Sequence, residues 1–316
     1  MLAPTYHSFS VRNTPLHTFD TSRPDLIHTM TAPSKVFFIT GVSSGFGKEY
    51  VIHALANGHK VVAAGRTGSK LTFPGATADN FLGVDVDVTS TPSTKAAFKA
   101  SLDKFGRLDV VCANSGYGLS GEFESLTEEQ VQEQFDVNFF GVTKTVRETL
   151  PILRQQKPAG GVIQVVTSIG GQIGVPTYTA YTASKWACEG FIESLAKETD
   201  QKPEWGIKYT LIEPGGFRTE WAGKNMKFND QQAKHSDYSH VNSKENASKR
   251  HGKQPGDPVK GAIAFYNLAL EKEPPLRVIL GSDAHAALTN KHKVDSERAK
   301  KWEHYTLNTD VDGYKA

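Results

Sequence analysis

A glycine-rich turn between a strand and a helix is the feature that most restricts the fold of this 316-residue chain. The apolar run 35–40 predicts a buried strand, Gly41-Val-Ser-Ser-Gly-Phe-Gly47 follows it, and a helical pattern then begins near Val51. This order places backbone N–H groups at a helix N-terminus, where a pyrophosphate binds, because glycine lets the phosphate approach the backbone. The spacing of the glycines excludes a Walker loop. A glycine-rich turn without a ligand is the alternative.

Strand and helix patterns alternate from residue 35 onward, which is typical of an α/β fold with a parallel sheet. Short apolar runs predict six further strands over residues 59–66, 80–88, 108–113, 161–168, 207–212 and 276–280. The length of the chain suggests about two domains, but a single large α/β domain fits equally well.

Three segments depart from this alternation. Residues 1–33 are polar and punctuated by proline, which predicts a loosely ordered extension. Residues 222–256 are polar and directly follow the sixth predicted strand, so we expect a partly mobile substrate lid at the ligand-binding edge, with disorder as the alternative. Residues 286–316 predict a charged helical tail, which leaves residues 34–285 as the catalytic domain.

Composition excludes several functional classes. The 36 Lys and Arg nearly balance the 34 Asp and Glu without a strongly charged block, which gives no support to nucleic-acid or membrane-surface binding. No apolar stretch approaches the ~18 residues that a membrane span needs. Cys112 and Cys188 lack metal-ligand spacing, so we expect reduced core thiols and no metal site. Since no secretory signal is evident, a cytoplasmic location is the default expectation.

A proton-transfer site is predicted after the strand over residues 161–168. Ser168 ends that strand, and Tyr181 and Lys185 lie four residues apart in a helix-forming segment, hence on one face. A lysine ammonium about 4 Å from a phenol favours the phenolate by ~4 kcal/mol, or roughly three pKa units. We therefore expect the pKa of Tyr181 to lie close to 7, where the side chain can act as acid or base. A chance Tyr–Lys pair, with Tyr in the core and Lys solvated, is the alternative.

The end of the second predicted strand favours NADP over NAD. NAD-selective sites carry an acidic residue there, whereas this chain has Gly65 followed by Arg66. An arginine can pair with a 2′-phosphate in bidentate fashion, and Ser44 can donate a second hydrogen bond. A solvated surface arginine is the alternative.

Other candidates follow strands at the same edge of the sheet. Asp87 can accept a hydrogen bond from an adenine amino group or serve as a turn residue. Asn114-Ser-Gly116 breaks the fourth strand, and Glu213-Pro-Gly-Gly-Phe-Arg-Thr219 ends the sixth. Asn138 lies in a helical pattern, where asparagine is unfavourable, so it is either exposed or its polarity has a use.

Together these motifs resemble those of the short-chain dehydrogenase/reductase family. The matching positions, in the family's order, are Thr40-Gly-x-x-x-Gly45-x-Gly47, Asp87-Val88, Ala113-Asn-Ser-Gly116, Asn138, Ser168, Tyr181-x-x-x-Lys185 and Pro214-Gly215. The resemblance covers about residues 35–285 and departs at Ala113 and Ser115, where the family has Asn and Ala. The stretches GVSSGFGKE, NSGYG and PPLRVILGSDAH are similar to retinol and steroid dehydrogenases and to microbial ketoreductases.

The resemblance implies a single Rossmann-like, doubly wound domain with about seven parallel strands and helices on both faces. It also implies hydride transfer between NADP(H) and a carbonyl or alcohol carbon. Tyr181 would be the general acid in reduction and the base in oxidation, and Ser168 would hold the substrate oxygen. Lys185 would bind the nicotinamide ribose and lower the pKa of Tyr181. Asn138 would help to anchor a water-mediated proton relay, and Thr219 would contact the nicotinamide side.

The resemblance and the strand-end positions together predict the cofactor-binding set. Its members are Gly41, Ser43, Ser44, Gly45, Phe46, Gly47, Arg66, Asp87, Val88, Asn114, Ser115, Gly116, Tyr181, Lys185, Pro214, Gly215, Phe217 and Thr219. Nearby apolar and aromatic residues favour a lipophilic or aromatic small-molecule substrate, although they equally suit core packing. They are Tyr117, Val175, Tyr178, Phe217 and Trp221.

The sequence does not decide the oligomeric state of the protein or exclude two other functions. Many relatives dimerise through the helices that hold the counterparts of Asn138 and Tyr181, so a homodimer and a monomer are both compatible with the sequence. The same fold also occurs in epimerases, dehydratases and isomerases, which catalyse no net redox change, and in non-catalytic NADP-binding sensors.

Overall fold

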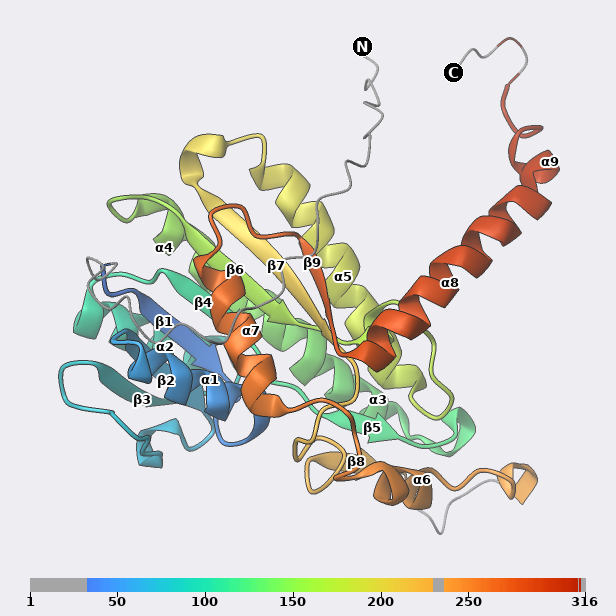
Figure 1. The fold of residues 1–316 in the computed structure, drawn as a ribbon, viewed down its shortest axis with the longest axis horizontal. Coiled ribbons are helices and arrows are strands. Elements are labelled where there is room, and N and C mark those ends of the chain that lie inside the picture. Colours follow the sequence, from blue (N-terminus) through green and yellow to red (C-terminus); the bar gives the residue numbers. More distant parts are fainter. Residues whose placement is uncertain (1–32, 230–235, 312, 314–316) are drawn as a thin grey trace, which may run out of the picture. The chain divides into compact units, whose positions relative to one another are not determined.

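Seven parallel strands form the central sheet of the computed structural model, which describes residues 33–229, 236–311 and 313 (Figure 1). Their order across the sheet is β3-β2-β1-β4-β6-β7-β9. The strands are β1 Val36–Thr40, β2 Lys60–Gly65, β3 Phe81–Asp85, β4 Val110–Ala113, β6 Gly161–Val166, β7 Ile207–Pro214 and β9 Arg277–Leu280. The predicted parallel sheet is confirmed. The extension predicted over residues 1–33 lies, apart from Pro33, outside the described residues.

The middle of the sheet is buried on both faces, which explains why its strands are continuous apolar runs rather than alternating ones. Phe38 of β1 pairs with Val62 of β2 on one side and with Val111 of β4 on the other. The chain builds the sheet outward from β1 to β3 and then crosses to β4 on the opposite side of β1. At such a reversal the loops after the two central strands diverge and open a crevice at their carboxyl ends.

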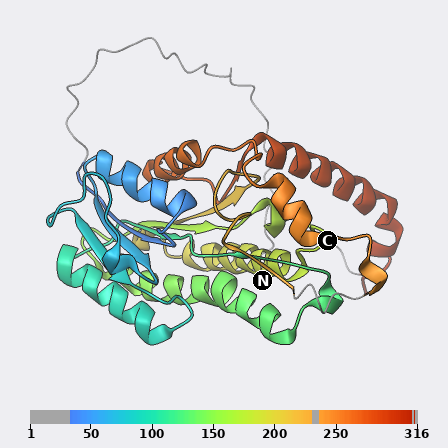
Figure 2. The same cartoon turned by 90° about the horizontal axis from the view of Figure 1, so that it is seen from below.

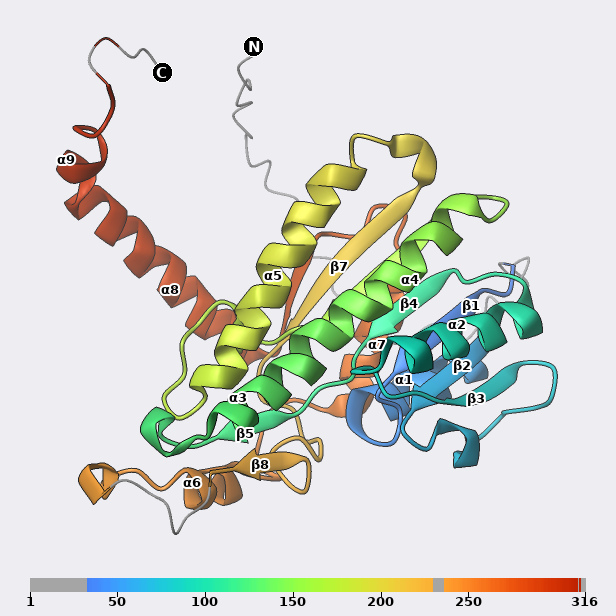
Figure 3. The same ribbon diagram turned by 180° about the vertical axis from the view of Figure 1, so that it is seen from behind.

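Helices cover both faces of the sheet. Helices α2 (Thr91–Phe105), α4 (Gly141–Gln155) and α5 (Thr179–Thr199) lie on one face, and α1 (Gly45–Ala56) and α7 (Pro258–Leu270) lie on the other (Figures 2 and 3). The predicted doubly wound α/β fold is confirmed. The remaining helical elements include α3 Glu128–Phe135, α6 Ser243–Arg250, α8 Ser282–Lys301 and α9 Glu303–Thr306. None of the helices in the described part of the chain is long and apolar enough to cross a bilayer.

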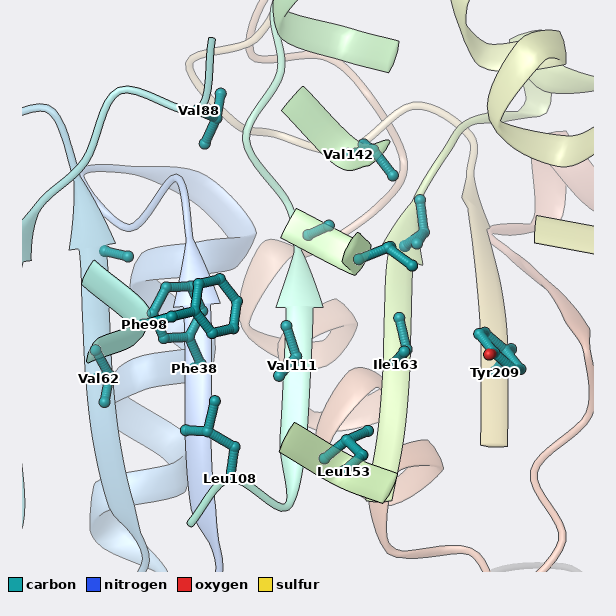
Figure 4. Packing of buried hydrophobic residues seen from close by; sticks show 14 of the residues in the cluster. Phe38, Val62, Val88, Phe98, Leu108, Val111, Val142, Leu153, Ile163 and Tyr209 are labelled. Atoms are coloured by element: carbon teal, nitrogen blue, oxygen red, sulfur yellow. The ribbon is translucent and has the colours of Figure 1, made fainter. Parts of the chain in front are cut away.

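The largest hydrophobic core of the described residues lies between the sheet and the α2–α4–α5 layer (Figure 4). The rings of Phe38 and Phe98 stack there with their centroids 4.4 Å apart. Leu108, Val111 and Ile163 continue the packing along β4 and β6, and all three are fully buried. This core holds the sheet rigid beneath the loops at its carboxyl edge.

The structure corrects several predicted boundaries. β3 ends at Asp85 and β6 at Val166, so Asp87 and Ser168 lie in loops after their strands rather than in them. The C-terminal helix α8 starts at Ser282, four residues before the predicted tail.

Two short strands were not predicted, since three residues are too few for a periodic pattern. β5 (Gly118–Ser120) pairs in parallel with β8 (Met226–Phe228). This pairing attaches the start of the predicted lid, residues 222–256, to the loop that follows β4. Helix α6 also falls within the predicted lid.

Candidate active site

A pocket of about 850 Å³ opens at the carboxyl edge of the sheet. Its walls come from the loops after β1, β2, β4, β6 and β7, together with the start of α5 and the predicted lid. It therefore lies at the reversal of strand order, where α/β sheets bind ligands. All the predicted site residues line this pocket except Gly47 and Asn138.

The glycine turn forms one wall of the pocket and leads into α1. Gly41 has a φ of 71°, which favours glycine, and a Cβ there would lie 2.9 Å from the Cα of Ser115. A Cβ on Gly47 would lie only 2.3 Å from the carbonyl oxygen of Gly41. Gly47 is thus needed for close packing of the helix beneath the turn, and its ligand contact stays a prediction. The Ser44 side chain does not cap α1, which leaves the first N–H groups of that helix available to an anion.

Hydrogen bonds join the glycine turn to the loop after β4. The Thr40 hydroxyl accepts from the backbone N–H groups of Asn114 and Ser115, each at 2.9 Å. In return, the Asn114 side-chain amide donates to the carbonyls of Thr40 and Gly41 at 2.9 and 3.1 Å. The Asn114 side chain therefore holds two loops together at the pocket wall, while its neighbours Ser115 and Gly116 present backbone to the cavity.

Arg66 lines the pocket just after β2 and is exposed. It forms no ion pair with the acidic residues that the structure describes, so its guanidinium is available to a phosphate. Asp87 also lines the pocket, and its carboxylate accepts from the Thr89 N–H at 2.9 Å and the Thr89 hydroxyl at 2.7 Å. Asp87 thus serves as a turn residue on the pocket wall. The glycine cradle, the free helix N-terminus and Arg66 together fit a phosphorylated dinucleotide.

Ser168 and Tyr181 meet on the opposite wall. The Ser168 hydroxyl accepts from the Gly170 N–H at 3.0 Å and also hydrogen-bonds to the Tyr181 hydroxyl. Tyr181 is only 7% exposed, and its ring centroid lies 5.1 Å from that of Trp221. Burial raises the pKa of Tyr181 well above its ordinary value, and the hydrogen bond from Ser168 opposes that rise only in part. Our prediction of a pKa near 7 is therefore wrong for this structure.

Lys185 lies on the same face of α5 as Tyr181, as its spacing predicted. Its ammonium lies 5.9 Å from the centre of the Tyr181 ring and donates to the carbonyl oxygen of Val166 at 2.8 Å. Burial lowers the pKa of Lys185 from its ordinary value. The estimate from the sequence considered only the attraction between the two charges and left out desolvation, which dominates the pKa of both groups.

Asn138 occupies a five-residue π-helical turn, Asp136–Phe140, between α3 and α4. Its side chain is fully buried, accepts from the Tyr117 N–H at 3.1 Å and donates to the Tyr117 carbonyl at 3.0 Å. The same amide donates to the Ser184 hydroxyl on α5 at 3.3 Å. The polarity of Asn138 thus has a structural use, since it connects the loop after β4 to the helix that carries Tyr181. π-helical turns of this kind are frequent at functional sites.

Comparison with known proteins identifies the family. The family model described as short chain dehydrogenase matches residues 35–230. The chain belongs to the short-chain dehydrogenase family. Oxidoreductase BOA17 of Botryotinia fuckeliana is 36% identical over 280 residues, which cover 87% of this chain and 98% of that protein. Retinol dehydrogenase 8 of Bos taurus is 36% identical over 206 residues, or 63% of this chain and 64% of that protein.

Solved structures share the fold. A short-chain dehydrogenase from Streptomyces avermitilis superposes with a TM-score of 0.77 at 31% identity, covering 88% of this chain and all of that one. An alcohol dehydrogenase from Thermococcus sibiricus, complexed with 5-hydroxy-NADP, gives 0.61 at 25% identity, covering 78% and 96%. This short-chain dehydrogenase is therefore an oxidoreductase of a family whose members bind nicotinamide cofactors.

Our sequence reasoning missed two site residues of this short-chain dehydrogenase, Asp283 and Arg250. Asp283 lies in the first turn of α8 and accepts from the Gly216 N–H at 2.7 Å, so it shapes the loop after β7. Arg250 ends α6 and donates to the Tyr178 hydroxyl at 2.6 Å. Asp283 lies within the stretch PPLRVILGSDAH that resembles the family, but the stretch gave no role for it. For Arg250, the signal in the sequence was its place in the predicted lid, residues 222–256.

A pair of buried carboxyl groups lies on β7 and α5 of this short-chain dehydrogenase, outside the pocket lining. Glu213 on β7 is fully buried and Glu189 on α5 is 4% exposed. Arg277 on β9 lies 2.9 Å from Glu189 and 3.7 Å from Glu213, and Gln172 donates to Glu213 at 2.7 Å. Burial and the neighbouring Glu189 raise the pKa of Glu213 to about 7, against the opposing effects of Gln172 and Arg277.

Proposed function

We propose that this protein is an NADP(H)-dependent oxidoreductase that interconverts a carbonyl group and an alcohol on a lipophilic or aromatic small molecule. One observation carries the proposal: Ser168, Tyr181 and Lys185 line the same pocket as the glycine turn and Arg66. The proposed proton donor Tyr181 thus lines the same cavity as the turn and the arginine that fit a phosphorylated dinucleotide.

The chain's own residues supply the proton chemistry. When bound, the nicotinamide cofactor supplies or accepts the hydride. In reduction, the Ser168 hydroxyl holds the carbonyl oxygen, and Tyr181 donates its proton to that oxygen as the carbon gains the hydride. Burial raises the pKa of Tyr181, which keeps the phenol protonated at neutral pH, as an acid must be, but makes it a weaker acid than a phenol with a pKa near 7. Lys185, anchored on Val166, binds the ribose beside it, and Asn138 holds the adjoining loop.

The preference for NADP rests on Arg66. Among the residues that the structure describes, no carboxylate pairs with this guanidinium after β2, which matches a 2′-phosphate in charge and geometry. One carboxylate oxygen of Asp87, which also lines the pocket, accepts from the Thr89 N–H and hydroxyl.

The substrate side of the pocket is aromatic. Tyr178 stacks on Trp221 with centroids 5.9 Å apart, and both flank Tyr181. Val175 and Tyr117 also line this region. We further propose that the catalytic domain spans residues 34–285, that residues 222–256 act as its substrate lid, and that residues 286–316 form a helical tail, which continues the helix α8 that starts at Ser282.

We propose that two copies associate through α4, α5 and the π-helical turn. Phe140 and Trp186 are exposed large apolar residues on this face, which also has a shallow apolar depression lined by Phe139 and Phe191. A homodimer would cover these rings.

The cytoplasmic location remains a prediction from the sequence.

Spectrophotometry of the nicotinamide band tests the proposed activity. Purified protein should oxidise NADPH faster than NADH in the presence of an aromatic ketone. Tyr181→Phe should abolish turnover while leaving NADPH binding intact. Tyr209→Phe, which removes a buried phenol outside the pocket, is the matched control and should stay active.

The other two candidate functions give different results. A product formed with no absorbance change would identify an epimerase, dehydratase or isomerase. Tight NADPH binding without turnover of any carbonyl compound would identify a sensor. Turnover that persists in Tyr181→Phe would contradict the proposed acid.

A further inference from the structure

The predicted lid brings a local excess of positive charge to the pocket. Residues 222–256 hold seven Lys or Arg and three Asp or Glu, a formal charge of +4 in a chain whose total is +2. Five of these cationic residues line the pocket, namely Lys224, Lys227, Lys249, Arg250 and Lys253. Cofactor phosphates can use part of this charge, so the position of each cation decides whether it is available to a substrate.

Two of these cations reach the substrate side, Arg250 and Lys227, whose ammonium lies 4.9 Å from the centre of the Tyr117 ring. Lys227 and Lys249 pair with Glu133 and Glu245, at 2.8 and 2.6 Å. Arg250 has no carboxylate partner in the part of the chain that the structure describes. One of its N–H groups donates to the Tyr178 hydroxyl, and its guanidinium carbon lies 5.6 Å from the centre of the Tyr178 ring.

The position of Tyr178 places this guanidinium near the reacting atoms. Tyr178 is 4% exposed, and its ring lies 6.2 Å from that of Tyr181, the proposed proton donor. Trp221 packs against both rings. Arg250 is therefore separated from the proposed acid by a single layer of aromatic side chains.

Phosphates of a bound cofactor do not account for Arg250. Asn225, next to Lys224, donates to the Ser44 hydroxyl in the glycine turn at 3.3 Å. The carbonyl of Gln254, next to Lys253, accepts from Arg218 in the loop after β7 at 2.7 Å. Lys224 and Lys253 thus lie beside the predicted cofactor wall, whereas Arg250 contacts the substrate wall.

We propose that the substrate is a keto acid or hydroxy acid whose carboxylate pairs with Arg250. This inference rests on the proposed oxidoreductase function. A guanidinium has five N–H donors in a planar fork, and Tyr178 uses one, so a carboxylate can bind the others in bidentate fashion. The aromatic or aliphatic body of the substrate then lies over Trp221, and the carbonyl reaches Ser168 and Tyr181. The carboxylate sets the orientation of the substrate and does not take part in the chemistry.

A matched pair of substrates tests this proposal, benzoylpropionate and its methyl ester, which differ in the charged group. The wild-type protein should reduce the acid with a higher kcat/KM than the ester. Arg250→Gln should lower kcat/KM for the acid by about 10- to 100-fold, as expected for loss of a charge-assisted hydrogen bond, mainly through KM. The same change should leave the ester within about twofold and the KM for NADPH unchanged. Lys244→Gln is the control, because Lys244 lies on the same helix, is exposed and does not line the pocket.

The outcomes separate this proposal from the proposed function. If Arg250→Gln slows the acid and the ester equally, or raises the KM for NADPH, the carboxylate site is refuted while the oxidoreductase stands. If neither compound is reduced, calorimetric titration of benzoylpropionate into the wild type and Arg250→Gln decides the question. Binding that depends on Arg250 supports the carboxylate site, and equal or absent binding refutes it.

Discussion

Replacing Glu213 by Gln should change how the stability of the fold depends on pH. Burial and the neighbouring Glu189 raise the pKa of Glu213 to about 7 in the folded protein, against an ordinary value of 4.5. Between these two pH values the folded state binds a proton that the unfolded state has released. The free energy of unfolding therefore falls as pH rises through this window, and the loss is complete above pH 7.

The size of the pKa shift of Glu213 sets how much the free energy of unfolding changes with pH. A change from 4.5 to about 7 corresponds to about 3 kcal/mol, at about 1.4 kcal/mol per pKa unit. Glu213 is fully buried, so solvent screening does not reduce this figure. Glutamine keeps an oxygen that can accept from Gln172 and has no charge to desolvate. Relative to the wild type, Glu213→Gln should gain about 2.5 kcal/mol between pH 5 and pH 8, because at pH 5 most unfolded chains have already released this proton.

Urea unfolding at both pH values, followed by circular dichroism, measures this difference. Glu273→Gln is the control, because Glu273 is an exposed residue paired with Lys208 at 2.7 Å. That ion pair holds the pKa of Glu273 below its ordinary value. Removing this carboxylate should therefore change the free energy of unfolding between the two pH values only slightly, and in the opposite direction to Glu213→Gln. Parallel stability profiles for Glu213→Gln and the wild type would refute the reasoning, since Glu213 would then not change its protonation over this range.

Three further predictions concern the pocket and the core. Gly47→Ala should abolish NADPH binding in a fluorescence titration, because its Cβ would lie 2.3 Å from the Gly41 carbonyl oxygen; Gly174→Ala, with open space around its Cβ, should bind normally. Arg66→Ala should raise the KM for NADPH by about 10- to 100-fold and leave that for NADH unchanged, as loss of a charged hydrogen bond implies; equal effects on both would contradict the 2′-phosphate assignment. Phe38→Ala should cost about 3–5 kcal/mol of stability in chemical unfolding, through the cavity left in the core, and a cost below 1 kcal/mol would show that the core collapses around it.

Local patterns predicted much of this protein. The strand–turn–helix order at residues 35–56 depends on glycine and on apolar runs, both of which are readable from neighbouring positions. Four-residue spacing placed Tyr181 and Lys185 on one helix face because helical geometry is nearly independent of context. The position of most predicted site residues on the pocket wall follows from one rule, that the loops after parallel strands meet at the same edge.

Other properties depend on contacts between residues far apart in the chain. The pKa of Tyr181 is raised because the folded chain removes water from the phenol, and no spacing in the sequence measures burial. Arg250 meets Tyr178 across 72 positions, through a segment whose composition alone is equally consistent with disorder. Glu213 and Arg277 likewise lie on strands β7 and β9, which become neighbours only when the sheet forms.

The sequence thus determined the seven strands of the main sheet, the glycine turn and the candidate reactive groups, because each is read from residues within a few positions of one another. Tertiary structure decided which groups are desolvated, which charges are paired and which side chains face the substrate. These depend on the distance and dielectric between side chains, and only the folded chain sets them.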